Sequence, residues 1–222
     1  MRRMVGARRA SGVMLAVMAA CTTGNAAELR VTVGSAGQPV VDAVVSLHGK
    51  ATPARDATAR MEQQHSTFAP GILPVQVGTV VSFPNRDNIQ HQVYSFSQAK
   101  QFEIPLYAGN NAAPVRFDRA GVVVVGCNIH DWMIGHIVVV DTPYFAKTPA
   151  SGAVRLDVPP GTYTLRVWHA RSETVFGKTG VIPAAGSAHA VGLVLAATAP
   201  EARGNDRLRA LQDKFRRLKG AQ

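Results

Sequence analysis

Cysteine is scarce in this sequence, which has only Cys21 and Cys127 among its 222 residues. So few cysteines exclude a fold held together by a network of disulfides. If a leader that includes Cys21 is removed, Cys127 is the single thiol of the mature protein. An oxidising compartment attacks a spare thiol, so a single retained cysteine needs a chemical reason. A bond between the Cys127 thiolate and a metal ion would supply that reason.

Long apolar runs are lacking as well. The run GVMLAVMAA (residues 12–20) is too short to span a bilayer, and no other segment is long and apolar enough to do so. Arginines precede this run and small residues follow it, which is the pattern of a secretory signal peptide. We predict a signal peptide over residues 1–27, cut after Ala26 or Ala27, and a periplasmic mature protein. The alternatives are a membrane anchor and a lipoprotein signal at MAAC, which would attach a lipid to Cys21.

Acidic residues are few, 14 against 24 Lys and Arg, and the formal net charge is +10. The excess lies at the two ends of the chain, because residues 1–27 contribute +4 and residues 201–222 another +4. The body of the protein, residues 28–200, is left with only +2. A body so close to neutral does not indicate a nucleic-acid surface, and we expect no nucleic-acid partner.

Aromatic residues make up only 6%, whereas Gly (20) and Pro (13) are frequent, a mixture typical of β-rich domains with many turns. Short segments with a period of two predict strands throughout the body, and GVVVVGCN predicts a strand buried on both faces. Short strands at this spacing favour β-sandwiches. The predicted strands cover residues 28–33, 42–49, 73–85 (two strands around Gly78), 91–97, 121–128, 136–142, 153–158, 162–169 and 189–196.

Helical periodicity is clear only in the tail, residues 201–222. Leu208, Leu211, Phe215 and Leu218 form one apolar stripe, and the other faces are basic. We predict a short amphipathic helix that covers a sandwich edge or frays. The alternative is contact with an anionic membrane surface or an acidic partner.

The segment CNIHDWM (residues 127–133) holds the strongest chemical signal. Its cysteine, histidine and methionine are Cys127, His130 and Met133, and a further histidine, His91, begins an upstream strand. If the two strands are neighbours, these four side chains can converge at one end of a sandwich. Two imidazoles, a thiolate and a weak axial thioether define a type 1 copper site. The alternative interpretations are ordinary core packing and a zinc site, for which methionine is a poor ligand.

At this point the sequence resembles the cupredoxins, the small blue copper proteins, over about residues 57–141. The Cys-x2-His-x2-Met spacing resembles amicyanin, plastocyanin has a longer loop, and the wider pattern resembles proteins labelled methylamine-utilisation proteins. The resemblance implies a Greek-key β-sandwich, one type 1 copper per chain, and the four ligands His91, Cys127, His130 and Met133. It also implies that Asn85 ties the ligand loops together. Gln92 and Asp131 depart from the family, which has Asn and Pro at these two places.

Other metal centres are excluded or less favoured. A binuclear copper centre needs two bridging cysteines, and multicopper oxidases need His-x-His pairs that this sequence lacks. His136 is an alternative axial ligand, although it more simply begins the next strand. His65 reads as part of an edge strand, and the remaining histidines as ordinary strand-end residues. Trp132 lies inside the ligand loop, either in the core or in an apolar docking patch with Ile129 and Ile134.

The segments on either side of the cupredoxin-like part resemble pieces of a carboxypeptidase-regulatory-like or transthyretin-like sandwich. Neither piece is long enough to bury a core alone, so we predict that they pair. The expected organisation is an all-β protein with two sandwiches and a short C-terminal helix. Its parts are a signal peptide (1–27), a split sandwich (28–50 with 147–197), a cupredoxin domain (51–146) and a basic helical tail (201–222).

These expectations lead to a carrier and not to an enzyme. The leading hypothesis is a periplasmic protein that shuttles single electrons between redox partner proteins, with His130 as the electron port. The alternative is a periplasmic copper-binding protein for storage or delivery. A third class is a structural two-sandwich protein without a metal.

Overall fold

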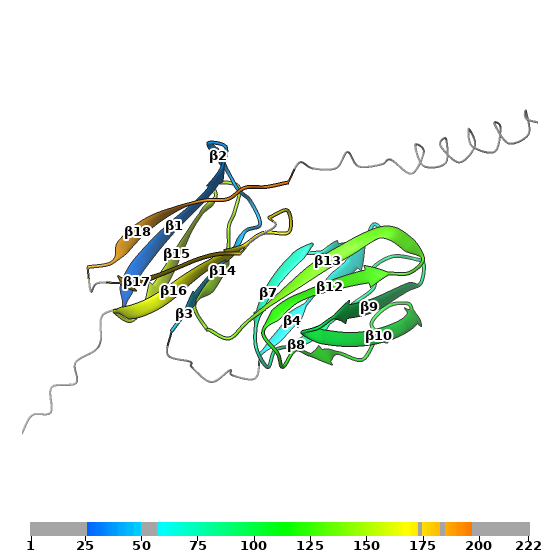
Figure 1. Cartoon of the computed structure of the whole chain (residues 1–222). Helices are drawn as coiled ribbons and strands as arrows, with labels where there is room; N and C mark the ends of the chain where they lie inside the picture. Colours follow the sequence, from blue (N-terminus) through cyan, green and yellow to red (C-terminus); the bar gives the residue numbers. More distant parts are fainter. Residues whose placement is uncertain (1–25, 50–56, 173–174, 183–184, 197–222) are drawn as a thin grey trace, which may run out of the picture.

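The computed structural model describes residues 26–49, 57–172, 175–182 and 185–196, and within them every element is a β-strand. Two β-sandwiches lie side by side (Figure 1). We call the one that contains Cys127 the site sandwich and the other the companion sandwich. Residues 1–25 of the predicted signal peptide, with Cys21, and the predicted C-terminal helix lie outside the described residues. The predicted end of the signal peptide at residue 27 overlaps the fold, because Ala27 begins the first strand, β1 (Ala27–Ser35), and is buried in its core. Among the described residues, no helix is long and apolar enough to cross a membrane.

The site sandwich packs a five-stranded sheet, in the order β10-β9-β12-β13-β7, against the three-stranded sheet β11-β8-β4 and the β5-β6 hairpin. Its core contains Phe83, Phe117, Met61, Val123 and Ile137. Its strands are β4 (Thr58–Arg60), β5 (Glu62–Gln64), β6 (Thr67–Ala69), β7 (Ile72–Gln76), β8 (Val80–Ser82), β9 (His91–Ser97), β10 (Lys100–Tyr107), β11 (Val115–Arg116), β12 (Gly121–Cys127) and β13 (His130–Val140).

The companion sandwich is built from both ends of the described chain. One sheet has the order β15-β1-β18, with β2 paired to β1, and the other has the order β14-β3-β16-β17. The predicted boundary between residues 146 and 147 falls inside β14, which pairs with β3. The strands are β1 (Ala27–Ser35), β2 (Gln38–Pro39), β3 (Val44–His48), β14 (Phe145–Lys147), β15 (Ala153–Val158), β16 (Gly161–Trp168), β17 (Phe176–Ile182) and β18 (Ser187–Gly192).

Alternation of apolar and polar residues explains most of these strands. In β1 the side chains of Leu29, Val31 and Val33 are buried in the companion core, whereas the residues between them face outward. The prediction for residues 121–128 is wrong in one respect, because Val124 is 44% exposed while Val123 and Val125 are fully buried. A continuous apolar run therefore does not distinguish a strand covered on both faces from one covered on a single face.

The two sandwiches share a small apolar junction. Ile72, Val138 and Val140 of the site sandwich belong to one buried cluster with Val44 of β3, and Phe145 and Trp168 pack against it. Beside this cluster, the ring of His136 lies 5.5 Å from that of Trp168. The companion sandwich therefore covers the C-terminal half of β13, and the other half of β13 extends toward the metal-ligand candidates (Figure 1).

A glycine in the companion sandwich provides a stability test. Gly152 has φ +68°, and a Cβ built there would lie 2.6 Å from the Val33 carbonyl oxygen. Gly37 also has positive φ, at +77°, but a Cβ there would meet nothing within 4 Å. We expect Gly37→Ala to cost about 1–2 kcal/mol for the left-handed backbone alone. Gly152→Ala should cost clearly more, because the backbone must also move. Urea unfolding of both variants measures the difference, and equal losses would contradict the predicted clash.

Candidate metal centre

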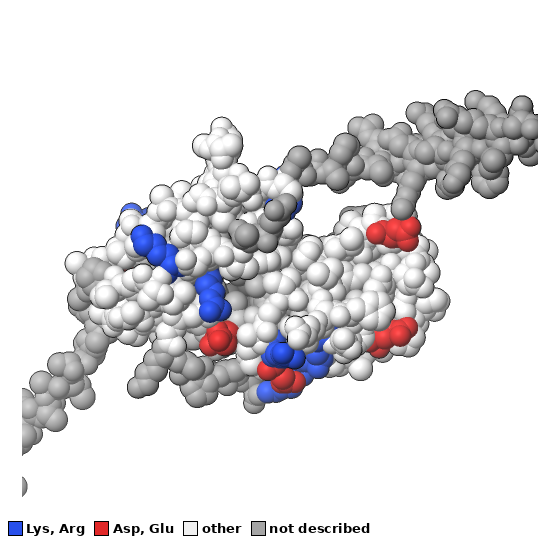
Figure 2. All heavy atoms as spheres, in the orientation of Figure 1, with Lys and Arg blue, Asp and Glu red and all other residues white. Residues whose placement is uncertain are grey.

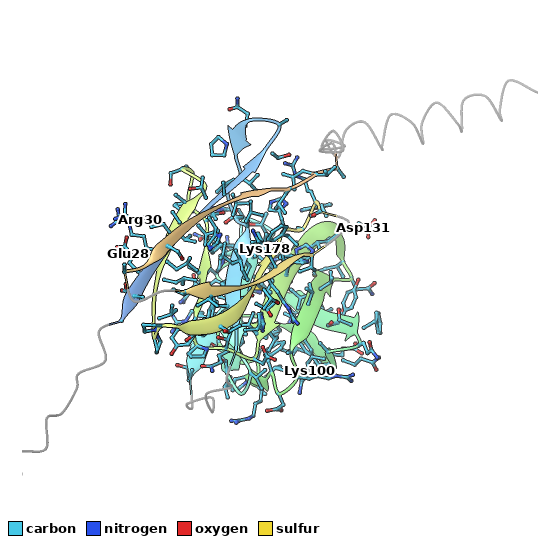
Figure 3. The ribbon with its side chains drawn as sticks, turned by 60° about the vertical axis from the view of Figure 1, so that its left-hand side comes forward. Glu28, Arg30, Lys100, Asp131 and Lys178 are labelled. Carbon is cyan, nitrogen blue, oxygen red and sulfur yellow. The ribbon has the colours of Figure 1, made fainter. Side chains whose placement is uncertain are left out.

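Three potential ligand atoms come together at one end of the site sandwich. Cys127 Sγ lies 3.9 Å from Nδ1 of His91 and 3.8 Å from Nδ1 of His130. In the described part of the chain, these three side chains form the one cluster of histidine, cysteine and carboxylate groups that lie close enough together to share a metal ion. His91 begins β9, Cys127 ends β12 and His130 begins β13, so three neighbouring strands position them. In Figure 3, the label of Asp131 marks the start of β13, directly after His130.

The spacing of these atoms fits a single bound ion. Imidazole nitrogen and thiolate sulfur bind zinc at about 2.0 to 2.3 Å, which places two donors of one ion roughly 3.5 to 4 Å apart. The two sulfur–nitrogen distances of 3.9 and 3.8 Å lie in this range. Both histidines present the same nitrogen, Nδ1, to the sulfur. The arrangement therefore needs little movement to hold one ion between three donors.

The fourth candidate, Met133, lies in the same core. Its side chain is 1% exposed and belongs to the buried cluster that also includes Cys127, Val125 and Ile137. His91 is completely buried, and Cys127 is 3% exposed. A buried thiol and a buried thioether are soft donors shielded from water, which favours a soft ion such as Cu(I).

Asp87 completes the surroundings of His91, and the sequence analysis missed it. Its Oδ2 accepts a hydrogen bond of 2.7 Å from His91 Nε2, which leaves Nδ1 turned toward Cys127. The backbone N–H groups of His65 and Ser66 also donate to this carboxylate. Burial acts to raise the pKa of Asp87, but the hydrogen bonds from Ser66, His91 and His65 outweigh it and hold that pKa below its usual range. The Asp-x3-His spacing was the available signal.

Asn85 organises the turn before His91. Its Nδ2 donates to the carbonyl oxygens of Ile89, at 2.7 Å, and Tyr107, at 3.0 Å, and its Oδ1 accepts from the N–H of Asp87. These bonds connect the His91 turn to the end of β10. The resemblance implied that Asn85 connects the loops that carry the ligands. The hydrogen bonds of its side chain all go to residues on the His91 side of the centre. Asn85 thereby holds Asp87 in place.

The surface beside the centre is mainly apolar, although the exposed Asp131 belongs to the same segment. His130 is partly exposed, and its ring centroid lies 5.2 Å from that of Trp132. Trp132 is 65% exposed, so it is not part of the core. Ile129 and Ile134 are also exposed, at 50% and 56%. Most of the face in Figure 2 is uncharged, and several of its charged groups, of both signs, gather along the lower edge.

The other histidines lie elsewhere. His136 is within β13, not at the start of a strand as predicted, because β13 already begins at His130. His65 is in the turn between β5 and β6 with φ 54°, so the predicted edge strand is wrong at this residue. His48 and His169 lie in the companion sandwich near the junction, and His189 lies in β18. Neither His136 nor His65 belongs to the metal-ligand cluster.

The junction histidines give a pH prediction. The pKa of His136 is lowered mainly by burial and further by the charge of His169. The pKa of His169 is lowered mainly by burial and further by the Arg171 guanidinium. Both groups are therefore neutral in the folded protein while the unfolded chain takes up protons below about pH 6.5. The free energy of unfolding should be largest above that pH. It should fall as the pH drops toward the pKa values that the two histidines have in the folded protein.

Thermal unfolding of the metal-free protein between pH 7.5 and 5 measures this loss. The midpoint Tm should fall by about 2–4 °C for each kcal/mol of lost stability. His136→Asn should flatten the dependence because it removes one of the two titrating groups. A variant with the same pH slope as the unaltered protein would contradict the assignment.

Comparison with protein-family models gives no match, and no curated protein matches the chain. Part of the chain is similar to solved structures of cupredoxins. A purple cupredoxin from Nitrosopumilus maritimus is 24% identical, with 38% of this chain and 100% of that chain covered and a TM-score of 0.33. A reduced amicyanin variant is 24% identical, over 45% of this chain and 99% of that one (TM-score 0.35). An oxidised amicyanin variant is 20% identical, over 43% and 98% (TM-score 0.36).

Proposed function

We propose that this protein is an exported, mononuclear type 1 copper protein that carries single electrons between redox partner proteins in the periplasm. The observation that supports this most directly is the cluster of His91, Cys127 and His130, whose donor atoms lie within 4.8 Å of one another. The signal-peptide pattern of residues 1–27 supports export.

Four residues would hold the ion in this proposal. Cys127 would bind as a thiolate, His91 and His130 through Nδ1, and Met133 through its thioether sulfur. Copper bound by this donor set changes between Cu(II) and Cu(I) by one electron. Asp87 accepts the Nε2–H of His91 and so fixes the orientation of that ring.

The protein scaffold suits a carrier. His91 and Cys127 come from hydrogen-bonded strands of one sheet, and the core around them is closed. A ligand set held this firmly changes little between two oxidation states, which keeps electron transfer fast. His130 is the partly exposed ligand, its ring lies beside that of Trp132, and Ile129 and Ile134 are exposed apolar residues of the same segment. We propose that a redox partner docks on this surface.

Reversible redox cycling tests the proposal against copper delivery. The purified protein is titrated with Cu(II) and with Cu(I), and then reduced and reoxidised repeatedly in a voltammetric cell. A carrier retains one copper through every cycle and gives a reversible one-electron wave. Binding of Cu(I) alone, with release to a chelating acceptor, would replace the carrier by a copper-delivery protein. Binding of neither ion would overturn both.

A further inference from the structure

A second constellation of reactive side chains lies at the junction of the two sandwiches. Ser46 Oγ is 2.9 Å from Nε2 of His48, and Nδ1 of the same imidazole is 2.5 Å from Oδ1 of Asp141. Ser46 and His48 are two residues apart on β3, so they lie on the same face of the strand. Asp141 follows directly after β13 and reaches this face from the site sandwich.

The order of atoms is that of a serine hydrolase triad. In such a triad the hydroxyl faces Nε2, and a carboxylate on Nδ1–H holds the imidazole in the tautomer that can accept the serine proton. The Ser46–His48 distance is that of an ordinary hydrogen bond, and the His48–Asp141 contact is shorter than an ordinary N–H···O bond. The triad is recognised by geometry and roles and not by chain order, so its assembly from two sandwiches is no obstacle.

The three residues border a cavity. Its volume is about 220 Å³, and its walls combine valines of β12 and β13 with Trp168 and Arg166 of β16. This is smaller than the roughly 300–1,000 Å³ of pockets for drug-sized ligands, so the acyl group that fits is short. Val44, Val138 and Val140 make part of the wall apolar. The Asp141 side chain is 61% exposed, whereas Ser46 is only 5% exposed and is approached through the cavity that it lines.

Arg166 supplies the positive charge. It is the direct cross-strand partner of Ser46 in the pairing of β16 with β3. Residues directly opposite each other in an antiparallel pair lie on the same face of the sheet. The guanidinium therefore belongs to the face that carries the serine, and Arg166 also lines the cavity. A cation on this face can stabilise the negative charge that develops on a carbonyl oxygen under attack.

We propose that Ser46, His48 and Asp141 form a second, metal-independent active site that hydrolyses short-chain carboxylic esters. Ser46 Oγ forms a bond to the carbonyl carbon while its proton passes to His48 Nε2, and the carbonyl π electrons move onto the oxygen facing Arg166. The tetrahedral adduct collapses, the carbon–oxygen bond to the alcohol breaks, and the leaving alcohol takes the proton from His48. Water then attacks the acyl carbon while His48 accepts its proton. The bond from this carbon to Ser46 Oγ breaks, the carboxylic acid leaves, and His48 returns the proton to Ser46 Oγ.

This activity is independent of the proposed electron transfer. β13 runs for eleven residues between His130 and Val140, and at about 3.3 Å per residue these lie roughly 30 Å apart. Asp141 is at one end of this strand and the metal-ligand candidates are at the other. Failure of one function therefore does not imply failure of the other.

Hydrolysis of p-nitrophenyl acetate by the full chain, in the presence of EDTA, tests the proposal. We expect turnover above the rate in buffer, abolished by Ser46→Ala and by His48→Asn and reduced about 10²–10⁴-fold by Asp141→Asn, the range that general acid–base catalysis contributes. Ser151→Ala, a serine in an exposed turn of the same sandwich, is the matched control and should keep the full rate.

Fluorophosphonate labelling followed by peptide mass spectrometry provides the second readout. We expect one label on Ser46 that His48→Asn prevents. Three results would overturn the proposal: no label on Ser46, activity that survives in Ser46→Ala but not in His48→Asn, which is simple imidazole catalysis, or activity lost with EDTA. Circular dichroism shows whether each variant is folded. Asp141→Asn changes an exposed group, so it keeps the test decisive if the buried Ser46 variant unfolds.

Discussion

Replacing Cys127 with serine is expected to abolish the blue copper spectrum of the protein. Cys127 is the free cysteine of the described residues, and its sulfur lies between the two imidazoles at 3.8 and 3.9 Å. A serine hydroxyl is nearly the same size, but it is not deprotonated as a thiolate is and cannot give the intense thiolate-to-copper band. Copper affinity should fall by more than the 10–100-fold that loss of a ligand's hydrogen-bond partner costs.

The control for this prediction is a histidine pair. His130→Asn removes a ligand candidate, whereas His136→Asn changes a histidine on the same strand outside the cluster. We expect the first to lose the spectrum and the second to keep it. Visible absorption after addition of Cu(II) is the measurement for all three variants. A Cys127→Ser protein that keeps an intense blue band would show that the thiolate is not the ligand.

Replacing Asp87 with alanine is expected to weaken both the fold and the metal centre. Three donors lose their acceptor, namely the His91 Nε2–H and the backbone N–H groups of His65 and Ser66. Of these, only the His91 imidazole is fully buried, and a buried donor without a partner costs about 1–3 kcal/mol. The His91 ring also loses the group that fixes its orientation, and copper affinity should fall by about 10–100-fold.

Two variants separate these effects. Asp87→Asn keeps an oxygen acceptor, so it should lose less stability than Asp87→Ala. Asp118→Ala removes a carboxylate that is 61% exposed and pairs with Arg116, and it should be close to neutral. Urea unfolding gives the stability of the metal-free proteins, and competition with a copper chelator gives the affinity. Equal behaviour of Asp87→Ala and Asp118→Ala would contradict the role assigned to Asp87.

The convergence of His91, Cys127 and His130 was predictable because it depends on local features. A histidine begins one strand, a cysteine ends another, and a second histidine follows three residues later. Once the two strands are neighbours, these positions meet at one end of the sheet. The Asp87 contact was not predictable in the same way, because it depends on the path of the turn that Asn85 organises, and a period of two does not describe turns.

Strand β10 was missed for a local reason. Its sequence KQFEIPLY contains Pro105, which reads as an interruption because proline cannot donate to a ladder. The strand lies at the edge of its sheet, and the register shifts between Ile104 and Tyr107, so Pro105 falls in an irregular part of an edge strand. Edge strands tolerate proline there, and the pattern alone does not tell which strands are at an edge.

The central claim is that His91, Cys127, His130 and Met133 bind one copper ion as a type 1 centre. The most direct measurement adds one equivalent of Cu(II) to the purified protein and records the visible absorption and EPR spectra. An intense blue band with narrow copper hyperfine splitting, at a stoichiometry of one, is the result that this account predicts. A colourless protein with the wide hyperfine splitting of ordinary Cu(II), or one that binds no copper, would contradict it.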